Sequence, residues 1–394
     1  MKKTVVIFLV ALVLGGLAAY QGETEAAPRT GTPIKVGVLV GLSSFVAPIG
    51  EHLKQGIEIA LDEVGRTIAG RRVEVIYEDE QGVPGASITK ARKLVEQDGA
   101  HALLVGTTSP ELIAIRDYVV QRNIPVIGLR PSAPSLREIQ WARNIFFATF
   151  RDDRFEEASA RLLFERLPHR KVILVGFDYS GGLTHVDAFE KAFTQAGGSI
   201  TGKILIPLGT ADPSPYVAKI DPKQADAVVA ILWGADAIRF TKTFAEYGLM
   251  KRIPFIPFGG GIMQPYVRNA VNVNILNGVI SYQEYAESLD SPENKKLREK
   301  VKQRYQDVVS GDAALGYTAA RALIEALKKI NGDVENVPRL LQALKQVEFE
   351  SPAGPFRFDE RNQAVKHVYL EKFEVKGGVG AQVLLGQKLN VCCE

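Results

Sequence analysis

The stretch that decides the fold covers residues 34–64 and reads IKVGVLVGLSSFVAPIGEHLKQGIEIALDEV. Its first seven residues, Ile34–Val40, are rich in β-branched side chains and are bounded by Pro33 and Gly41, which predicts a buried strand. Apolar residues then recur at helical spacing, at Leu53, Ile57, Leu61 and Val64. A buried strand followed by an amphipathic helix is the first half of a βαβ unit, so the chain is predicted to begin a parallel sheet.

The same alternation of short apolar runs and helix-period segments continues along the chain. In its first part we predict further strands at Val73–Tyr77, Ala102–Val105, Pro125–Ile127 and Ile145–Thr149. The rhythm restarts after Arg151, with strands predicted at Val172–Val175, Ile204–Pro207, Ala227–Leu232 and Phe255–Phe258. Two long amphipathic helices, Ser291–Val309 and Asp312–Lys329, precede strand-like segments near the C-terminus. We therefore predict an α/β protein built from two doubly wound parallel-sheet lobes.

Length and composition agree with this prediction and exclude several classes of protein. The chain has 394 residues, of which 46% are hydrophobic and 24% charged, which is typical of a globular protein of about two domains. A net charge of +3 is too small and too evenly spread to indicate nucleic-acid binding. The five histidines are scattered and the two cysteines, Cys392 and Cys393, are adjacent, so no zinc site of the usual spacing is possible. We expect neither a metal nor a cofactor.

The N-terminus predicts export. Lys2 and Lys3 precede an apolar run from Val5 to Ala19, and small residues follow it near Ala27. This pattern is typical of a secretory signal peptide, which we assign to residues 1–27, with an uncleaved anchor as the alternative. No cysteine follows the apolar run, so we expect no lipid anchor there. The mature protein is predicted to be soluble and exported.

The motifs that could indicate an enzyme or a cation site are better explained in other ways. Residues 197–203 have the glycine and lysine spacing of a phosphate-binding loop, but they lead from a helix into a strand, whereas such a loop must lead from a strand into a helix. A triad of Ser180, His185 and Asp178 has no preferred geometry at that spacing. The acidic run at residues 78–80 is interpreted as a solvated strand end rather than a cation site. We therefore expect a protein that is not an enzyme.

Small hydroxyl residues and aromatic residues gather where the predicted strands end. In the first half these junctions are residues 41–44, 106–110 and 128–132, and in the second half they are residues 178–180, 233–234 and 259–261. Ligands of open α/β sheets bind at the carboxyl ends of the strands. Hydroxyl groups and helix N-terminal amides there suit a carboxylate, and Tyr179 and Trp233 supply apolar walls. The junctions therefore predict a site for a small carboxylate.

Several short motifs follow one another in a fixed order between residues 35 and 373. They include Gly41-x-x-Ser44-x-x-Ala47-x-x-Gly50 with Gln55-Gly56, the segments Tyr77-Glu78-Asp79 and Ala91-Arg92-Lys93-Leu94-Val95, and the hairpin Gly354–Asp359. Because it carries these motifs in this order, the chain resembles the leucine/isoleucine/valine-binding protein family. These are periplasmic solute receptors of ABC importers for branched-chain amino acids and related small acids.

The resemblance implies a specific organisation and partners. Three crossovers, near Phe150–Asp152, Ser281–Tyr285 and Phe349–Ser351, would join lobe 1 (residues 33–151 and 282–350) to lobe 2 (residues 152–281 and 351–390). A ligand would lie in the cleft between the lobes, which close by hinge motion. The partners would be the ligand and the inner-membrane permease, and we expect a monomer. The rival hypothesis is a sensor of the same fold that signals to a kinase or a regulatory protein.

The resemblance also assigns residues to the ligand. These residues are Ser109, Arg130, Ser132, Tyr179, Ser180, Trp233, Gly259 and Tyr282. The two first-lobe hydroxyls, Ser109 and Ser132, would hold the ligand carboxylate together with backbone amides. Arg130 either pairs with that carboxylate or forms a surface ion pair. Tyr179 or Ser180 matches a second-lobe aromatic position, and Trp233 would close over the ligand.

One departure from the family bears on the ligand. Amino-acid receptors of this family usually carry an acidic residue after the fourth strand of the second lobe, where this chain reads Phe258-Gly259-Gly260-Gly261. Burying a neutral polar group without a hydrogen-bond partner costs about 2–7 kcal/mol, and burying an ammonium group without a partner costs at least as much. This favours a non-amino carboxylate, aromatic or aliphatic. An amino acid stays open, because Asp178, Asp236 or Glu284 could supply the charge.

Overall fold

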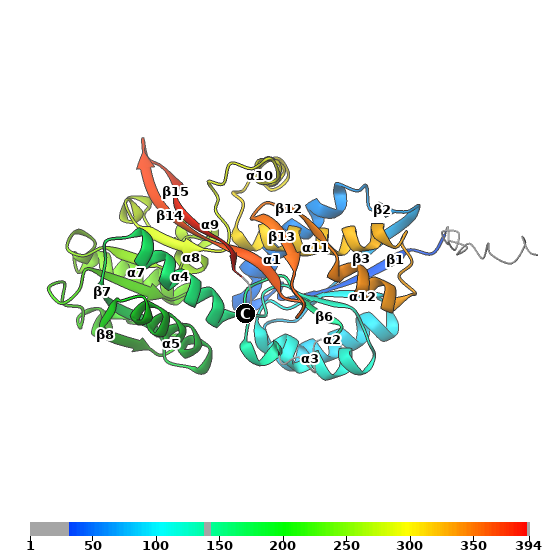
Figure 1. Ribbon diagram of the computed structural model, residues 1–394, viewed down its shortest axis with the longest axis horizontal. Helices are drawn as coiled ribbons and strands as arrows, with labels where there is room; N and C mark the ends of the chain where they lie inside the picture. The colour runs from blue at the N-terminus through cyan, green and yellow to red at the C-terminus, as the bar shows by residue number, and fades with distance from the viewer. Residues whose placement is uncertain (1–30, 138–142, 392–394) are drawn as a thin grey trace, which may run out of the picture.

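The computed structural model describes residues 31–137 and 143–391, and Figure 1 shows them as two α/β lobes side by side. The predicted α/β class with two parallel-sheet lobes is confirmed. The predicted signal peptide and the cysteine pair lie outside the described residues. Within the described ranges, no helix is both long and apolar enough to cross a membrane.

The first lobe contains a six-stranded sheet. Its strands, in spatial order, are β2 (Thr67–Ile68), β3 (Arg71–Asp79), β1 (Ile34–Val40), β4 (Ala102–Val105), β5 (Val126–Gly128) and β6 (Ile145–Phe147). All neighbours are parallel except β2, which pairs antiparallel with β3. Strands buried on both faces consist of nearly continuous apolar runs, and this is why β1 and β4 have the predicted bounds.

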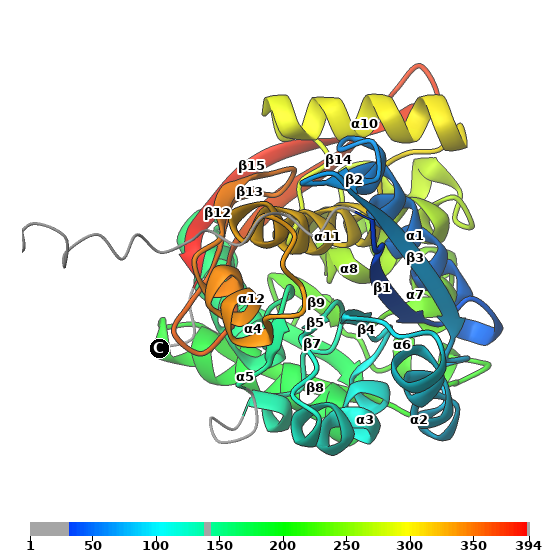
Figure 2. The ribbon, with the colours of Figure 1, turned by 90° about the vertical axis from the view of Figure 1, so that its right-hand side faces the viewer.

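Helices cover both faces of this sheet (Figure 2). The helices α1 (Ala47–Asp62) and α11 (Gly311–Lys329) share one hydrophobic core with it, and α2 (Pro84–Arg92) and α3 (Ser109–Gln121) share the other. The first pair packs with the two backbones almost in contact. A Cβ atom on Gly56 would lie 1.9 Å from the Ala313 carbonyl oxygen, and one on Gly316 would lie 2.1 Å from that of Leu53. Glycine is therefore required at both positions.

The second lobe contains a four-stranded parallel sheet. Its order is β10 (Phe255–Pro257), β9 (Ala227–Ile231), β7 (Lys171–Phe177) and β8 (Ser199–Ile206). One face packs with α4 (Asp152–Arg166) and α5 (Ser180–Gln195), and the other with α7 (Gly234–Glu246), α8 (Gly259–Ile262) and α9 (Pro265–Arg268). The short helix α6 (Ser214–Val217) follows β8.

A third, antiparallel sheet joins the lobes. It contains β11 (Ile280–Gln283), β12 (Glu348–Ser351), β13 (Gly354–Phe358), β14 (Ala364–Lys376) and β15 (Val379–Val391). The last two form a long ribbon that extends along the second lobe (Figure 1). Single bridges from Phe147 to Gln363 and from Phe258 to Tyr282 connect this sheet to the two parallel sheets. Helices α10 (Pro292–Tyr305) and α12 (Val337–Lys345) belong to the intervening chain.

The cores indicate where the chain changes lobes. Phe356, Phe358 and Ala364 belong to a core of the first lobe, whereas Val368 and Leu370 belong to a core of the second. We therefore propose that the third crossover lies along β14, after Ala364, and not at residue 351 as the sequence predicted.

Candidate functional site

The first-lobe hydroxyl residues meet at the carboxyl edge of the sheet. Ser109 is the first residue of α3, and Ser132 lies in the loop after β5. The Ser109 Oγ accepts the backbone N–H groups of Ser132 and Ala133, both at 3.1 Å. A serine oxygen that accepts two hydrogen bonds has only its hydroxyl hydrogen left to offer, so Ser109 is set to donate to an acceptor such as a carboxylate.

Arg130 is committed to carboxylates of the protein itself. Its Nη1 lies 3.1 Å from Glu284 Oε1 and its Nε lies 3.3 Å from Asp312 Oδ1. Glu284 also accepts from Lys366 Nζ at 2.6 Å and from Thr149 Oγ1 at 3.2 Å. Burial alone would raise the pKa of Glu284, but Lys366 and Arg130 hold it below its usual value. The Arg130 side chain is only 20% exposed, so the observed ion pairs lie in the interior rather than on the surface.

Helix α9 of the second lobe contacts the first lobe directly. The Tyr266 hydroxyl donates to Asp312 Oδ2 at 2.8 Å, and the Gly311 N–H donates to Gln264 Oε1 at 3.0 Å. The rings of Tyr266 and His52 have centroids 4.7 Å apart. The N-terminus of α11 is thus the point at which the two lobes meet on this side.

The second lobe contributes an aromatic group, which consists of Phe177, Tyr179, Trp233 and Phe258. Tyr179 and Trp233 are the N-caps of α5 and α7, so both lie where a parallel strand turns into a helix. The Trp233 ring lies 4.7 Å from that of Phe177 and 6.4 Å from those of Tyr179 and Phe258. Burial and the nearby Asp152 raise the pKa of Tyr179 to about 12. The structure thus brings Tyr179 and Trp233 together; the side chain of Ser180 lies outside the described atoms.

His185 lies behind the aromatic group, 5.4 Å from the Trp233 ring. Its Nδ1 is 2.9 Å from Glu156 Oε1 and its Nε2 is 3.4 Å from Asp152 Oδ1, so neither nitrogen serves a catalytic triad with Asp178. Burial alone would lower the pKa of His185, but the two carboxylates raise it to about 10, so the ring is an imidazolium at neutral pH. The Asp152 N–H donates to the Ser132 carbonyl at 3.1 Å, so Asp152 links His185 to the first-lobe loop.

Two predicted ligand residues lie inside the protein. Tyr282 has no exposed surface, and its hydroxyl donates to Glu156 Oε2 at 3.0 Å. Gly259 is buried at the start of α8, where a Cβ atom would lie 2.9 Å from the Tyr282 carbonyl oxygen. Both residues therefore support the aromatic group from behind. Phe258, which completes that group, was not predicted, because an apolar residue at a strand end carries no functional signal.

The acidic residues that could meet an ammonium group are mostly engaged. Asp236 accepts from the Gly209 N–H at 2.8 Å and pairs with Arg239. Glu284 is held by Arg130 and Lys366 as described above, and Asp178 is exposed at the end of β7. The prediction of a solvated acidic run at residues 78–80 is wrong for Glu78 and Glu80, which are both buried; Glu80 has no exposed surface.

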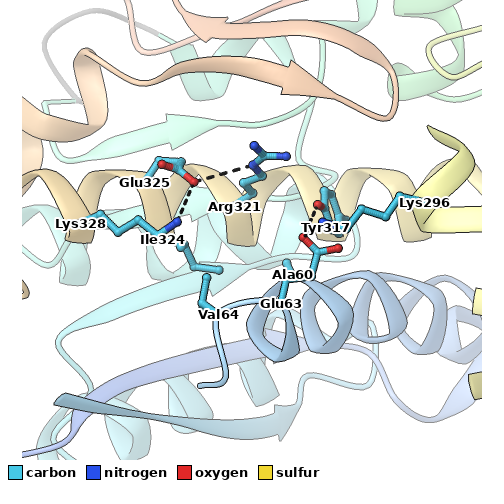
Figure 3. Close-up of a pocket in the computed structure, with 9 residues that line it drawn as sticks. All are labelled: Ala60, Glu63, Val64, Lys296, Tyr317, Arg321, Ile324, Glu325 and Lys328. Atoms are coloured by element: carbon cyan, nitrogen blue, oxygen red, sulfur yellow. Dashed lines mark hydrogen bonds and ion pairs between the residues drawn. The ribbon is translucent and has the colours of Figure 1, made fainter. Parts of the chain in front are cut away.

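A separate pocket of about 150 Å³ lies on the first lobe, between α1, α10 and α11 (Figure 3). Its charged side chains are paired with one another; Glu63 accepts from Tyr317 at 2.8 Å and pairs with Lys296 at 2.9 Å. The lining residues are Ala60, Glu63, Val64, Lys296, Tyr317, Arg321, Ile324, Glu325 and Lys328. None of the predicted site residues belongs to this pocket.

Comparison with known proteins gives a consistent result. A family model described as periplasmic binding protein matches residues 33–378. The chain is 29% identical over 380 residues to the Leu/Ile/Val-binding protein homolog 6 of Brucella melitensis, covering 94% of this chain and 93% of that protein.

Two solved structures are similar over most of the chain. An ABC transporter substrate-binding protein from Sphaerobacter thermophilus is 34% identical, with a TM-score of 0.86, and the match covers 91% of this chain and 98% of the other. A solute-binding protein of an ABC transporter from Rhodopseudomonas palustris, in complex with 3,4-dihydroxybenzoic acid, is 25% identical, with a TM-score of 0.83 and the same coverage.

Proposed function

The chain belongs to the periplasmic binding protein family, and from this premise we propose that it captures a non-amino, aromatic carboxylate between its lobes and delivers it to the permease of an ABC importer. The observation that carries the proposal is the aromatic group of Phe177, Tyr179, Trp233 and Phe258 at the strand ends of the second lobe. We infer that the protein is exported and acts as a monomer.

The first-lobe loops suit the carboxylate end of such a ligand. The Ser109 hydroxyl has both acceptor positions filled and one hydrogen to donate, and it lies at the N-terminus of α3, whose dipole favours an anion. We assign the ligand carboxylate to Ser109 and Ser132. Arg130 is assigned to the frame of the site, because two protein carboxylates already neutralise its charge.

The second-lobe groups suit an aromatic ring. Faces and edges of Tyr179 and Trp233 offer the offset and edge-on contacts that aromatic pairs prefer, worth about 0.5–1.5 kcal/mol each beyond burial. The Rhodopseudomonas palustris neighbour, whose ligand is an aromatic carboxylate, supports this choice.

A branched-chain amino acid is the second candidate, and the Brucella melitensis relative favours it by its name. It requires a carboxylate for its ammonium group, however. Asp236 and Glu284 already have cationic partners, so an amino acid would compete there with Arg239 or with Arg130 and Lys366. Asp178, the third acidic residue that could supply the charge, is exposed at the end of β7. The aromatic carboxylate avoids this cost.

A ligand panel tests the proposal. Purified protein is titrated calorimetrically with benzoate, 3,4-dihydroxybenzoate and L-leucine, and melting temperatures are measured with each compound. A ligand at 100 times its Kd stabilises the folded protein by about 2.7 kcal/mol. We expect both benzoates to bind and L-leucine not to bind. Binding of L-leucine alone would refute the argument from the missing acidic residue.

A variant pair tests the location. Trp233→Ala is expected to weaken benzoate binding about tenfold or more, because it removes most of one aromatic wall. Tyr247→Ala is the matched control, since Tyr247 is an exposed aromatic residue of the same lobe (46% exposed). Equal affinities for Trp233→Ala and wild type would show that the ligand lies elsewhere.

A further inference from the structure

A buried carboxylate lies beneath the first-lobe loops, directly after β3. Glu80 has no exposed surface, and its Oε1 accepts the backbone N–H of Thr107 at 2.6 Å. Among the described residues, its Oε2 has no hydrogen-bond partner. If Glu80 were ionised in this position, its Oε2 would have neither water nor a hydrogen-bond donor, so burial disfavours the ionised form.

Glu80 is connected to the site through Thr107. The Thr107 Oγ1 accepts the Gly41 N–H at 2.7 Å, so one residue holds the loops after β1 and β4 together. The neighbouring Asp79 holds the first of these loops by accepting the Leu42 N–H at 2.8 Å. Thr107 stands two residues before Ser109, the hydroxyl that we assign to the ligand carboxylate. Any charge on Glu80 therefore acts on the loop that is to receive an anion.

The surroundings of Glu80 oppose its ionisation. Burial is the main cause that raises its pKa to about 8; the hydrogen bonds from Thr107 lower it. Two acidic groups raise the pKa of Glu80 further, namely Glu111 on α3 and Asp79 at the end of β3. Glu111 is itself buried and accepts from the Thr108 hydroxyl. Glu80 thus lies in a small acidic cluster under the loop.

We propose that Glu80 is a positioning residue that holds the Thr107–Ser109 loop as a neutral acid, and that its ionisation weakens binding of the carboxylate ligand. The proposal rests on the proposed function, because it takes the ligand to be an anion held at this loop. Neutral Glu80 still accepts the Thr107 N–H through its carbonyl oxygen, so the loop keeps its geometry. The ionised form adds a negative charge beneath it.

The test is the pH dependence of benzoate binding, measured by calorimetry at pH 6.5 and pH 9.0. For wild type we expect the Kd to rise about fivefold over this range, because Glu80 is only partly ionised in the complex at pH 9.0. The limiting effect at higher pH is about tenfold, which corresponds to repulsion between unit charges about 10 Å apart at an effective dielectric constant of about 20. Glu80→Gln keeps the acceptor for Thr107 but cannot ionise, so its Kd is expected to change less than about twofold. The matched control is Glu78→Gln. Glu78 lies on β3, two residues before Glu80, but its carboxylate pairs with Lys90 and Lys93, so this variant is expected to keep the wild-type pH dependence.

The outcomes separate the two proposals. If wild type and Glu80→Gln bind benzoate with the same pH dependence, the role of Glu80 is refuted and the proposed function stands. If wild type binds none of the panel at either pH, the proposed function fails and the role of Glu80 fails with it.

A second measurement needs no variant. The Thr107 amide resonance of wild type is followed by NMR against pH, with and without saturating benzoate. Because coupling is reciprocal, a tenfold effect on Kd must raise the midpoint of this titration by about one pH unit when benzoate is bound. An unchanged midpoint would refute the inference even if Glu80→Gln did not fold.

Discussion

Replacing Tyr266 by phenylalanine removes one hydroxyl from the contact between the lobes. That hydroxyl donates to Asp312 at 2.8 Å, and Asp312 has no exposed surface. Phenylalanine keeps the ring that lies 4.7 Å from His52, so the packing of α9 is retained. Asp312 keeps Arg130 as its remaining partner, 3.3 Å away.

The size of the expected loss in ligand affinity follows from the charge of the acceptor, Asp312. A hydrogen bond to a charged group contributes about 1.5–3 kcal/mol, and water replaces part of it when the lobes separate. We therefore expect Tyr266→Phe to destabilise the closed arrangement by about 1.4 kcal/mol, which weakens ligand binding about tenfold. Burial and Asp312 raise the pKa of Tyr266 well above its usual value, so the hydroxyl stays protonated. The loss in affinity should thus be the same at pH 6.5 and pH 9.0.

The assay combines calorimetry with small-angle scattering. Calorimetry gives the Kd for benzoate, and scattering gives the radius of gyration with and without it. We expect the variant to need more benzoate than wild type to reach the compact form. Tyr247→Phe is the control, because this exposed tyrosine should give wild-type values. If Tyr266→Phe binds as tightly as wild type, the contact between α9 and α11 does not contribute to closure.

Three further predictions concern stability and are checked by urea unfolding. Arg130→Met leaves the buried carboxylate of Asp312 without its cation, whereas Glu284 keeps Lys366, so we expect a loss of about 3–5 kcal/mol, as for other broken buried ion pairs. Gly56→Ala places a methyl group 1.9 Å from the Ala313 carbonyl oxygen, so it should cost about 1–3 kcal/mol or more, whereas the open site at Gly85 should tolerate alanine. The pKa of His185 is raised from 6.5 to about 10, so its contribution to stability is complete below pH 6.5 and is lost as the pH rises towards 10. Wild type should therefore lose more stability than His185→Gln between pH 7 and pH 10; parallel curves would contradict this assignment.

Local patterns predicted the elements that are buried on both faces. Strands β1 and β4 consist of continuous apolar runs, and their predicted bounds agree with the structure. The same reasoning did not find β12, β15 or α12. In β15 the exposed residues alternate with partly buried ones and two glycines interrupt the run, so its pairing with β14 stabilises it more than its own composition does.

The candidate site could be predicted only in part. Resemblance supplied Ser109 and Ser132 as a pair, and one hydrogen bond, from the Ser132 N–H to the Ser109 Oγ, brings them together. The sequence offered no means to find the partners of Arg130, because Glu284 lies 154 residues away along the chain. Glu80 was expected in solvent, since an acidic run at a strand end is usually solvated, yet the loops after β1 and β4 cover it.

The sequence by itself determined the fold class, the two lobes, the family and the strand ends at which a ligand is expected, because periodicity and short motifs depend on residues close together in the chain. The tertiary structure alone decided which charged groups are already paired and which are buried without a partner. Those properties depend on contacts between distant segments and on exclusion of water, and they determine whether Arg130, Glu284 and Glu80 serve the ligand or the frame around it.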